Sequence, residues 1–140
     1  MAQKDPLAGI ITHLKTISAI TTLTSTRIFG QELPRSEAAN MPVAAAVLVS
    51  AGGLGSIEFT RYRVYRLDCR SYGETPKLAM DVHMAIDEEL TTNLIRKEAS
   101  DTYFYNASLD GGPLALRDPD ADWPFVQASY LIRFSIETMS

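Results

Sequence analysis

Apolar residues recur at helical spacing in two segments of the chain. The first covers residues 5–17, where Asp5 is a plausible N-cap and Pro6 takes the first helical position. The second covers residues 75–90, with Thr75 as the cap and Pro76 at the first position. The apolar stripe of the first segment consists of Leu7, Ile10, Ile11, Leu14 and Ile17. That of the second consists of Leu78, Ala79, Val82, Ala85, Ile86 and Leu90.

Continuous apolar runs and period-two alternation predict the strands. The predicted strands cover residues 27–29, 42–50, 57–71, 102–110 and 125–139. Residues 42–50 are apolar at nearly every position, which is typical of a strand buried on both faces. Along residues 125–139 the even-numbered positions are the more apolar, so they should face the core. Leu67 and Cys69 should face inward as well, and a change of phase upstream indicates a bulge near residues 63–65.

Three segments between these elements are predicted to be connections. Residues 18–26 are rich in Thr and Ser and show no clear period. Residues 51–56, AGGLGS, resemble a hairpin connector, and residues 111–124, GGPLALRDPDADWP, carry strong turn chemistry. The order of elements predicts an α+β domain over residues 1–140, with one mostly antiparallel sheet and two main helices packed on one face.

Composition and charge narrow the class of protein. The chain has 140 residues, 46% of them hydrophobic, and a net charge of −4. That balance predicts one soluble domain and argues against a surface that wraps nucleic acid. A single cysteine excludes an internal disulfide and a cysteine-based zinc site. Without a signal-like N-terminus or a long apolar run, we expect a cytoplasmic protein and no membrane partner.

The segments that resemble cofactor-binding or metal-binding motifs match those motifs only in part. Gly53-Leu54-Gly55 lacks the third glycine of a dinucleotide site, because position 58 is Glu and a strand follows. Asp118, Asp120 and Asp122 resemble the start of a calcium loop, but its later ligand positions do not match. The sequence therefore predicts no cofactor, no metal site and no enzyme activity.

The side chains that could react have ordinary structural interpretations. His13 and His83 lie on the predicted helices, and no serine or cysteine is spaced to form a nucleophile pair with either. Cys69 is expected to be a small core residue. We expect Asp81, Asp87 and Glu88 to be solvated. A small enzyme or ligand-binding module remains an alternative, since catalytic groups converge in space rather than in sequence.

A group of basic and aromatic residues forms the candidate interface. Arg61, Arg63, Arg66 and Arg70 make one strand locally basic. The strand could be a solvated sheet face, or it could face an acidic neighbour or passing nucleic acid. Trp123 lies in a predicted loop, where aromatic residues are common interface anchors. Leu54 lies in the predicted loop 51–56 and Arg117 lies in the predicted loop 111–124. Both are candidate interface residues, because these two long loops offer surfaces on which another protein could stack.

The order of elements resembles the tail terminator family of long-tailed bacteriophages, also called tail-completion or tail-to-head joining proteins. The resemblance rests on an opening amphipathic helix, the short RIFG strand, the Pro-led strand MPVAAAVLVS, and an arginine-rich strand ending in YRLDCRSYG that passes into TPKLAMDVHMAIDEEL. It covers nearly the whole chain. Its most specific part runs from Arg61 to Leu90.

The resemblance implies a structural virion protein without enzyme activity. It implies a hexameric ring that caps the head-proximal end of the tail tube, stops polymerisation and joins tail to head. The implied partners are further copies of the chain, the tail tube protein and the head-closure or connector protein. DNA would pass through the lumen without sequence-specific binding, and assembly would take place in the host cytoplasm. A head-closure or minor tail protein of the neck is the alternative within this class.

Overall fold

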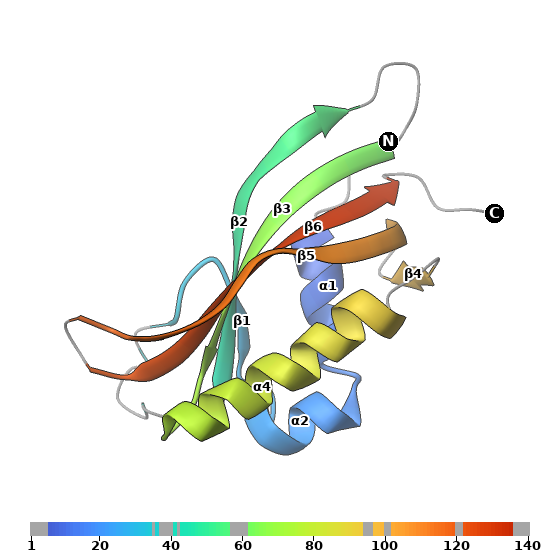
Figure 1. Cartoon of the computed structure of the whole chain (residues 1–140). Helices are drawn as coiled ribbons and strands as arrows, with labels where there is room; N and C mark the ends of the chain where they lie inside the picture. Colours follow the sequence, from blue (N-terminus) through green and yellow to red (C-terminus); the bar gives the residue numbers. More distant parts are fainter. Residues whose placement is uncertain are drawn as a thin grey trace.

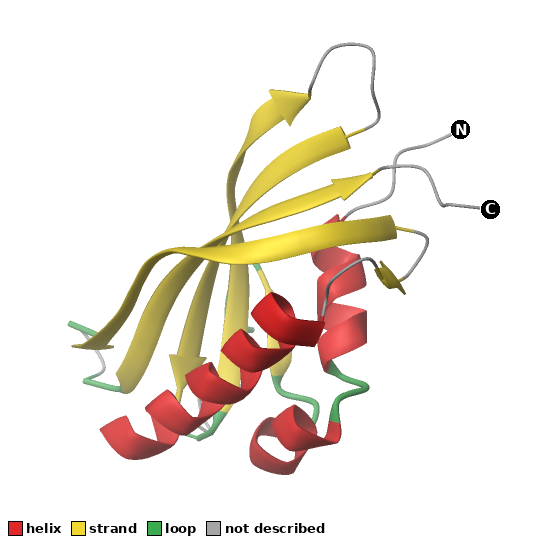
Figure 2. Ribbon diagram, turned by 45° about the vertical axis from the view of Figure 1, so that its right-hand side comes forward, coloured by secondary structure: helices red, strands yellow, loops and turns green. Residues whose placement is uncertain are grey.

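A six-stranded sheet organises the chain, and the helices lie on one side of it (Figures 1 and 2). The computed structural model describes residues 6–34, 36, 41, 43–56, 62–93, 97–99, 102–119 and 122–135. The strand order is β1-β2-β3-β6-β5-β4. Only β1 and β2 pair in parallel among the described strands; the other neighbours are antiparallel. The expected α+β class with one mostly antiparallel sheet is confirmed.

The elements have the following bounds. The helices are α1 (Pro6–Leu14), α2 (Ser18–Thr24) and α4 (Pro76–Glu88), which continues into a π-helical turn, η1 (Glu89–Asn93). The strands are β1 (Ile28–Gly30), β2 (Ala45–Ser56), β3 (Tyr62–Tyr72), β4 (Lys97–Ala99), β5 (Thr102–Arg117) and β6 (Pro124–Ser135).

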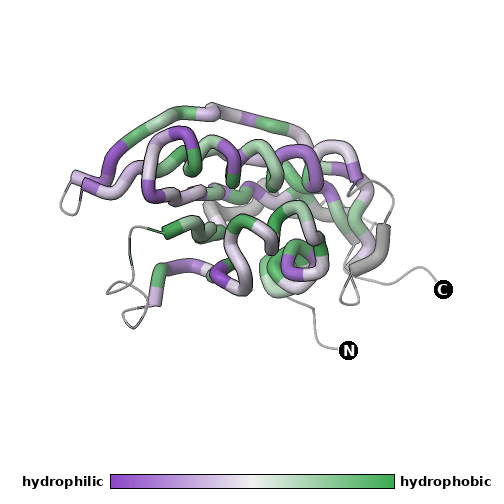
Figure 3. Tube along the Cα trace, turned by 90° about the horizontal axis from the view of Figure 1, so that it is seen from below, coloured by the Kyte–Doolittle hydropathy of each residue, from purple (hydrophilic) through white to green (hydrophobic). Residues whose placement is uncertain are grey.

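The main core lies between the helices and one face of the sheet, which we call the core face. Helices α1 and α4 contribute the aliphatic side chains Ile10, Leu14 and Ile86, all of which are fully buried. The sheet contributes alternate residues, among them Leu67 of β3 and Tyr130 of β6. The apolar, even-numbered side of β6 therefore faces the core, as its alternation predicts. Figure 3 shows hydrophobic and hydrophilic positions alternating along these elements.

A smaller apolar cluster lies on the opposite face, which we call the outer face. It is built from Ala45, Val47, Tyr72 and Phe125, with Trp123 packed against it. Neighbouring β2 residues such as Ala46 and Leu48 belong to the main core instead. Strand β2 is thus buried on both faces at its start, which explains its unbroken apolar run.

The start of α4 follows the expected capping chemistry. The Thr75 side chain accepts a hydrogen bond from the Leu78 N–H at 3.2 Å, and Pro76 occupies the first turn. Two expectations about the helix faces are wrong. Leu78 is 36% exposed rather than in the core. Asp87 is only half-buried and accepts a hydrogen bond from the Tyr130 hydroxyl at 2.8 Å, so this carboxylate is not simply solvated.

The first helix is shorter than predicted and a further helix follows it, so three of the described helices, rather than the two main helices predicted, cover the core face. Helix α1 ends at Leu14, and Ile17 is extended, with φ −93° and ψ 113°. The Thr- and Ser-rich residues that follow form α2, which the sequence pattern did not indicate. Burial of Ile20 and Thr24 against the core accounts for this, because tertiary packing overrides the weak helix propensity of Thr and Ser.

The glycine-rich segment 51–56 is not a hairpin connector but the second half of β2. It pairs with β3 through Gly53 opposite Tyr65 and Gly55 opposite Val64, with register shifts between Ser50 and Gly55. The register of β3 with β6 is unbroken from Tyr62 to Tyr72. The irregularity suspected near residues 63–65 therefore belongs to β2, where glycine tolerates bulged geometry.

Most of the segment 111–124 is likewise strand rather than loop. Strand β5 continues to Arg117, and Leu114 and Leu116 pair with Gln127 and Phe125 of β6. The Asp118 N–H donates to the Trp123 carbonyl at 2.9 Å and closes the hairpin. Pairing with the strongly patterned β6 outweighs the turn propensity of residues 111–113, which are accommodated by register shifts. The short strand β4 was not predicted either.

Candidate functional site

The arginines of β3 whose side chains the structure describes, Arg66 and Arg70, lie on the outer face. Arg66 is exposed, and its Nη2 donates to the Asp110 carboxylate at 2.8 Å. On the same face the Ser129 hydroxyl donates to Asp68 at 2.6 Å, and Arg133 donates to Asn106 at 2.9 Å. These contacts tie β3, β5 and β6 together. The Arg66–Asp110 pair is a cross-strand contact of the kind expected on a solvated sheet face, and the alternative of a face presented to an acidic neighbour or to nucleic acid stays a prediction.

The remaining candidate residues are not gathered at one place. Arg117 and Trp123 lie at the tip of the β5–β6 hairpin, at one end of the sheet. Leu54 belongs to the part of β2 that pairs near Tyr65, towards the other end. Arg61 lies outside the described residues, as do the side chains of Arg63 and Leu54. Arg70 is exposed on the outer face opposite Gln127, close to the end of β3 at Tyr72, and so lies near the hairpin tip.

The hairpin tip is held by specific contacts. Arg117 donates from Nη1 to the Asp122 carbonyl at 3.1 Å, and the Asp122 carboxylate lies 3.6 Å from the same nitrogen. The Trp123 ring meets Tyr72 edge to face, with ring centroids 6.4 Å apart. Trp123 is half-buried, so it covers the edge of the outer-face cluster and still presents part of its surface. Both interpretations of this tryptophan, core cover and exposed anchor, fit its position.

Two exposed leucines beside the tip were missed by the sequence reasoning. Leu114 is 57% exposed and Leu116 is 38% exposed, and both share the outer face with Gln127 and Phe125. A shallow, open pocket of about 320 Å³ lies here, lined by Gly111, Gly112, Leu114, Leu116, Gln127, Ala128 and Ser129. The period-two spacing of Leu114 and Leu116 was the available signal, but the surrounding Gly and Pro residues concealed it.

The buried polar groups beneath α4 do not form a reaction site. Cys69 is fully buried, and burial raises its pKa to about 12. The thiol therefore stays protonated at neutral pH and is a poor nucleophile. Burial also raises the pKa of Tyr130 and lowers the pKa of His83. His83 Nδ1 has no hydrogen-bond partner among the described residues, and the ring packs as a core side chain.

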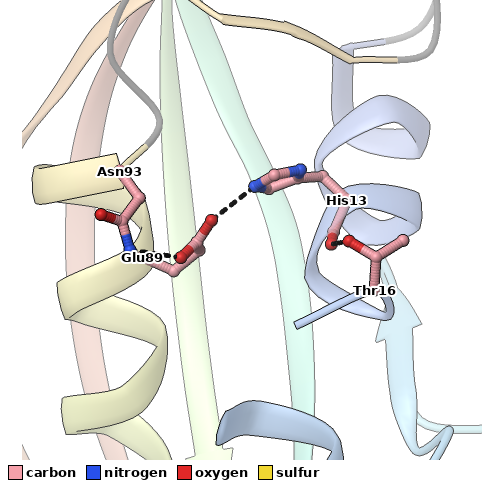
Figure 4. Close-up of polar contacts among 4 residues, drawn as sticks. All are labelled: His13, Thr16, Glu89 and Asn93. Atoms are coloured by element: carbon pink, nitrogen blue, oxygen red, sulfur yellow. Dashed lines mark hydrogen bonds and ion pairs between the residues drawn. The ribbon is translucent and has the colours of Figure 1, made fainter. Parts of the chain in front are cut away.

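His13 joins two helices rather than activating a nucleophile. Its Nε2 lies 2.6 Å from the Glu89 carboxylate, and Asn93 donates to the other oxygen of the same carboxylate at 2.7 Å (Figure 4). Glu89 is 4% exposed, so this buried carboxylate depends on those two partners. The contact connects α1 with the end of α4, as a structural histidine would.

The described ranges contain no cluster of three or more His, Cys, Asp or Glu side chains placed to hold a metal ion. Of the three aspartates that resemble a calcium loop, Asp120 lies outside the described residues and Asp122 bonds Arg117. None of the described helices combines the length and apolar character that a membrane crossing requires.

Comparison with known proteins reveals a likeness of fold. No family model matches the sequence, and no curated protein matches it. A chain from the virion of a native gene transfer agent particle superposes with a TM-score of 0.73 at 13% sequence identity, over 92% of this chain and 93% of that one. The gp17 protein of bacteriophage SPP1 gives a TM-score of 0.47 at 15% identity, over 95% of this chain and 89% of that one. The chain thus shares its fold, over nearly its whole length, with a protein chain of a virion.

Proposed function

We propose that this protein is a structural component of a tailed bacteriophage or a tail-like particle. The observation that carries the proposal is the shared fold with a chain of a gene transfer agent virion, which spans nearly the whole of both chains. The side chains support a role in assembly rather than catalysis. The most reactive type of residue, Cys69, is buried and protonated, while exposed leucines gather at the β5–β6 hairpin.

Within that class, the proposed role is that of a tail terminator. Six copies would form a ring at the head-proximal end of the tail tube, stop its polymerisation and join the tail to the head. The tube protein and the head-closure protein would be its partners, and DNA would pass through the lumen. Repeated head-to-tail contacts between identical subunits produce such a closed ring when the rotation between subunits closes.

Deleting the gene in the particle that encodes it tests this role. We expect tails of abnormal length and heads without tails, because nothing would stop the tube or join it to the head. Electron micrographs of the lysate give both readouts. Tails of normal length beside heads that leak DNA would instead indicate a head-closure protein. Normal, infectious particles would contradict both roles.

Complementation of the deletion tests the candidate interface at the hairpin tip. We expect Trp123→Ala to reduce tail joining, because Trp123 is half-buried at the tip and leaves part of its ring exposed to a partner. Met84→Ala is the matched control, since Met84 is 59% exposed on α4, away from the hairpin. If folded Trp123→Ala protein restores tail joining as fully as Met84→Ala, Trp123 is not part of the interface.

A further inference from the structure

Among the described residues, no strand pairs with the edge of β5 that faces away from β6 over most of its length. Strand β4 pairs only with Thr102–Phe104. From Asn106 to Arg117, none of the described strands pairs with the side of β5 that faces away from β6. Figure 1 shows this part of β5 extending beyond the helices to the hairpin tip. A long open edge is a template for adding a strand unless the fold protects it.

The hydrogen-bond pattern identifies which backbone groups face outwards. Asp118 donates to the Trp123 carbonyl, so these two residues face each other across the hairpin. The Pro124 carbonyl accepts from Gly73, on the β3 side, and proline has no N–H. Arg117 and Pro124 are therefore a pair without mutual hydrogen bonds. Along two antiparallel strands, residue pairs that exchange hydrogen bonds alternate with pairs that do not. Ala115 and Arg117 both belong to pairs of the second kind, so their N–H and C=O groups point away from β6, to the open edge.

The pocket beside this edge suits an added strand. Leu114 and Leu116 stand on the outer face, next to the outward-facing backbone of Ala115, and line the pocket of about 320 Å³. Recognition by strand addition combines main-chain hydrogen bonds with pockets for alternate side chains. Both features occur together here, so an extended segment fits this surface better than a helix does.

The opposite edge of the sheet, formed by β1 and β2, offers a strand that could pair with β5. Strand β1 pairs with β2 only at Ala46–Leu48. Some backbone groups on the free edge of β1 already have hydrogen-bond partners within the chain: the Ile28 N–H donates to the Thr26 carbonyl, and the Gly30 carbonyl accepts from the Glu32 N–H. Residues 51–56 of β2 have no described strand on that side. The strands β2, β3, β6 and β5 are each antiparallel to the next, so β5 runs opposite to β2. A second copy in the same orientation, shifted along the strands, would thus present β2 antiparallel to β5.

We propose that the open edge of β5 at Leu114–Arg117 binds residues 51–56 of β2 from a second copy of this chain. Leu54 is the one large apolar residue in that stretch of the sequence, so it is the residue that best suits an apolar pocket. The contact is head-to-tail, so each copy uses both edges of its sheet. The inference rests on the proposed ring function and specifies the contact between neighbouring subunits.

Self-association of the purified full chain tests the contact. Analytical ultracentrifugation over a concentration series should show oligomers for the natural sequence. Leu114→Asp places a charge in the pocket, and Ala115→Pro removes one outward N–H for which the described residues provide no backbone partner. Each should weaken self-association by about tenfold or more. Both should keep the circular dichroism spectrum of the natural chain, because proline is tolerated where a strand N–H faces solvent.

Met84→Asp is the matched control, because it charges an exposed apolar side chain on α4, and it should associate normally. Leu54→Asp should weaken association as Leu114→Asp does. Folded Leu114→Asp and Ala115→Pro proteins that associate normally would overturn the proposal. So would a natural chain that stays monomeric up to about 1 mM. Neither result bears on the deletion phenotype, which tests the terminator role separately.

Cross-linking distinguishes the head-to-tail contact from a two-fold contact between two β5 edges. Ala115→Cys and Ser50→Cys place thiols on the β5 edge and at the start of the open part of β2, while Cys69 stays buried. With a short bis-maleimide, the double variant should give a ladder of cross-linked copies and each single variant should give none. Dimers from Ala115→Cys alone would contradict the head-to-tail arrangement.

Discussion

At the scale of single residues, close approach between backbones decides where side chains are tolerated. Gly73 lies between the end of β3 and the start of α4. A Cβ at this position would lie 2.4 Å from the Ala79 nitrogen and 2.7 Å from the Leu78 carbonyl carbon. Both are backbone atoms, so they cannot yield by a side-chain rotation. The glycine of the Tyr-Gly turn is thus required by the distance between helix and strand.

We expect Gly73→Ala to lower the free energy of unfolding by about 1–3 kcal/mol, because the added methyl group forces α4 away from β3. Urea denaturation measures the change. Gly111→Ala is the control, since a Cβ there meets no atom within 4 Å, and it should change stability by less than about 0.5 kcal/mol. Equal effects of the two substitutions would show that the close approach does not matter.

The buried thiol gives the protein a specific dependence on alkaline pH. The pKa of Cys69 is raised by burial from 9.0 to about 12. Above pH 9 the unfolded chain loses this proton and the folded chain keeps it. The folded state then binds more protons, so the free energy of unfolding falls with rising pH, by up to about 1.4 kcal/mol per pH unit from this group.

We therefore expect the stability of Cys69→Ala to fall less steeply than that of the natural chain between pH 9 and pH 10. Burial is the largest cause of the raised pKa values of Tyr72 and Tyr130 and acts in both proteins, while the Cys69 thiol adds a smaller rise to the pKa of Tyr130. The difference between the two slopes therefore reports the thiol together with its effect on Tyr130. Denaturant titrations at a series of pH values supply the two slopes. Parallel slopes would mean that the thiol already ionises in the folded chain.

At the scale of elements, the contact of His13 with Glu89 fixes α1 against the end of α4. Each helix also buries an apolar face, so the polar contact adds orientation to packing that burial already favours. The sequence does not reveal this contact, because the two residues are 76 positions apart. It places both histidine and carboxylate in expected helices without showing that they meet.

We expect His13→Ala to lower the free energy of unfolding by about 1–3 kcal/mol, since it leaves a buried carboxylate with Asn93 as its one remaining partner among the contacts in Figure 4. Lys15→Ala, at an exposed position just after α1, should change little. Thermal unfolding followed by circular dichroism compares the two. If both variants unfold at the natural midpoint, the contact does not stabilise the helix pair.

Strands β2 and β5 show where reasoning from local pattern fails. Glycine and proline in 51–56 and 111–117 indicate turns by themselves, yet both segments pair with a well-patterned neighbour. A partner strand supplies hydrogen bonds that local propensity cannot anticipate. The misassigned segments are also the open edges of the sheet, where the proposed subunit contact lies.

At the scale of the whole molecule, two apolar clusters lie on opposite faces of one sheet. The helices cover the larger cluster, and Trp123, the single tryptophan of the chain, packs against the smaller one. The strands β2, β3 and β6 contribute residues to both clusters. Loss of either cluster should therefore disrupt the other through the shared strands.

We expect tryptophan fluorescence and far-ultraviolet circular dichroism to give the same unfolding midpoint, because a single cooperative transition removes both clusters together. Urea titrations followed by both probes test this. A fluorescence change at lower urea than the circular dichroism change would show that the outer-face cluster unfolds independently. The chain would then unfold as two separate cooperative units.

The sequence by itself determined the elements whose patterns are strong: the first helix and the helix at 75–90, the capped start at Thr75, the buried face of β6 and the inward position of Cys69. These depend on periodicity and local capping, which neighbouring residues encode. The tertiary structure alone decided that α2 is helical, that β2 and β5 extend through their glycines, and that Leu114, Leu116 and the open edge meet at one surface. Those features depend on residues distant in sequence, because pairing and burial provide free energy that local pattern does not contain.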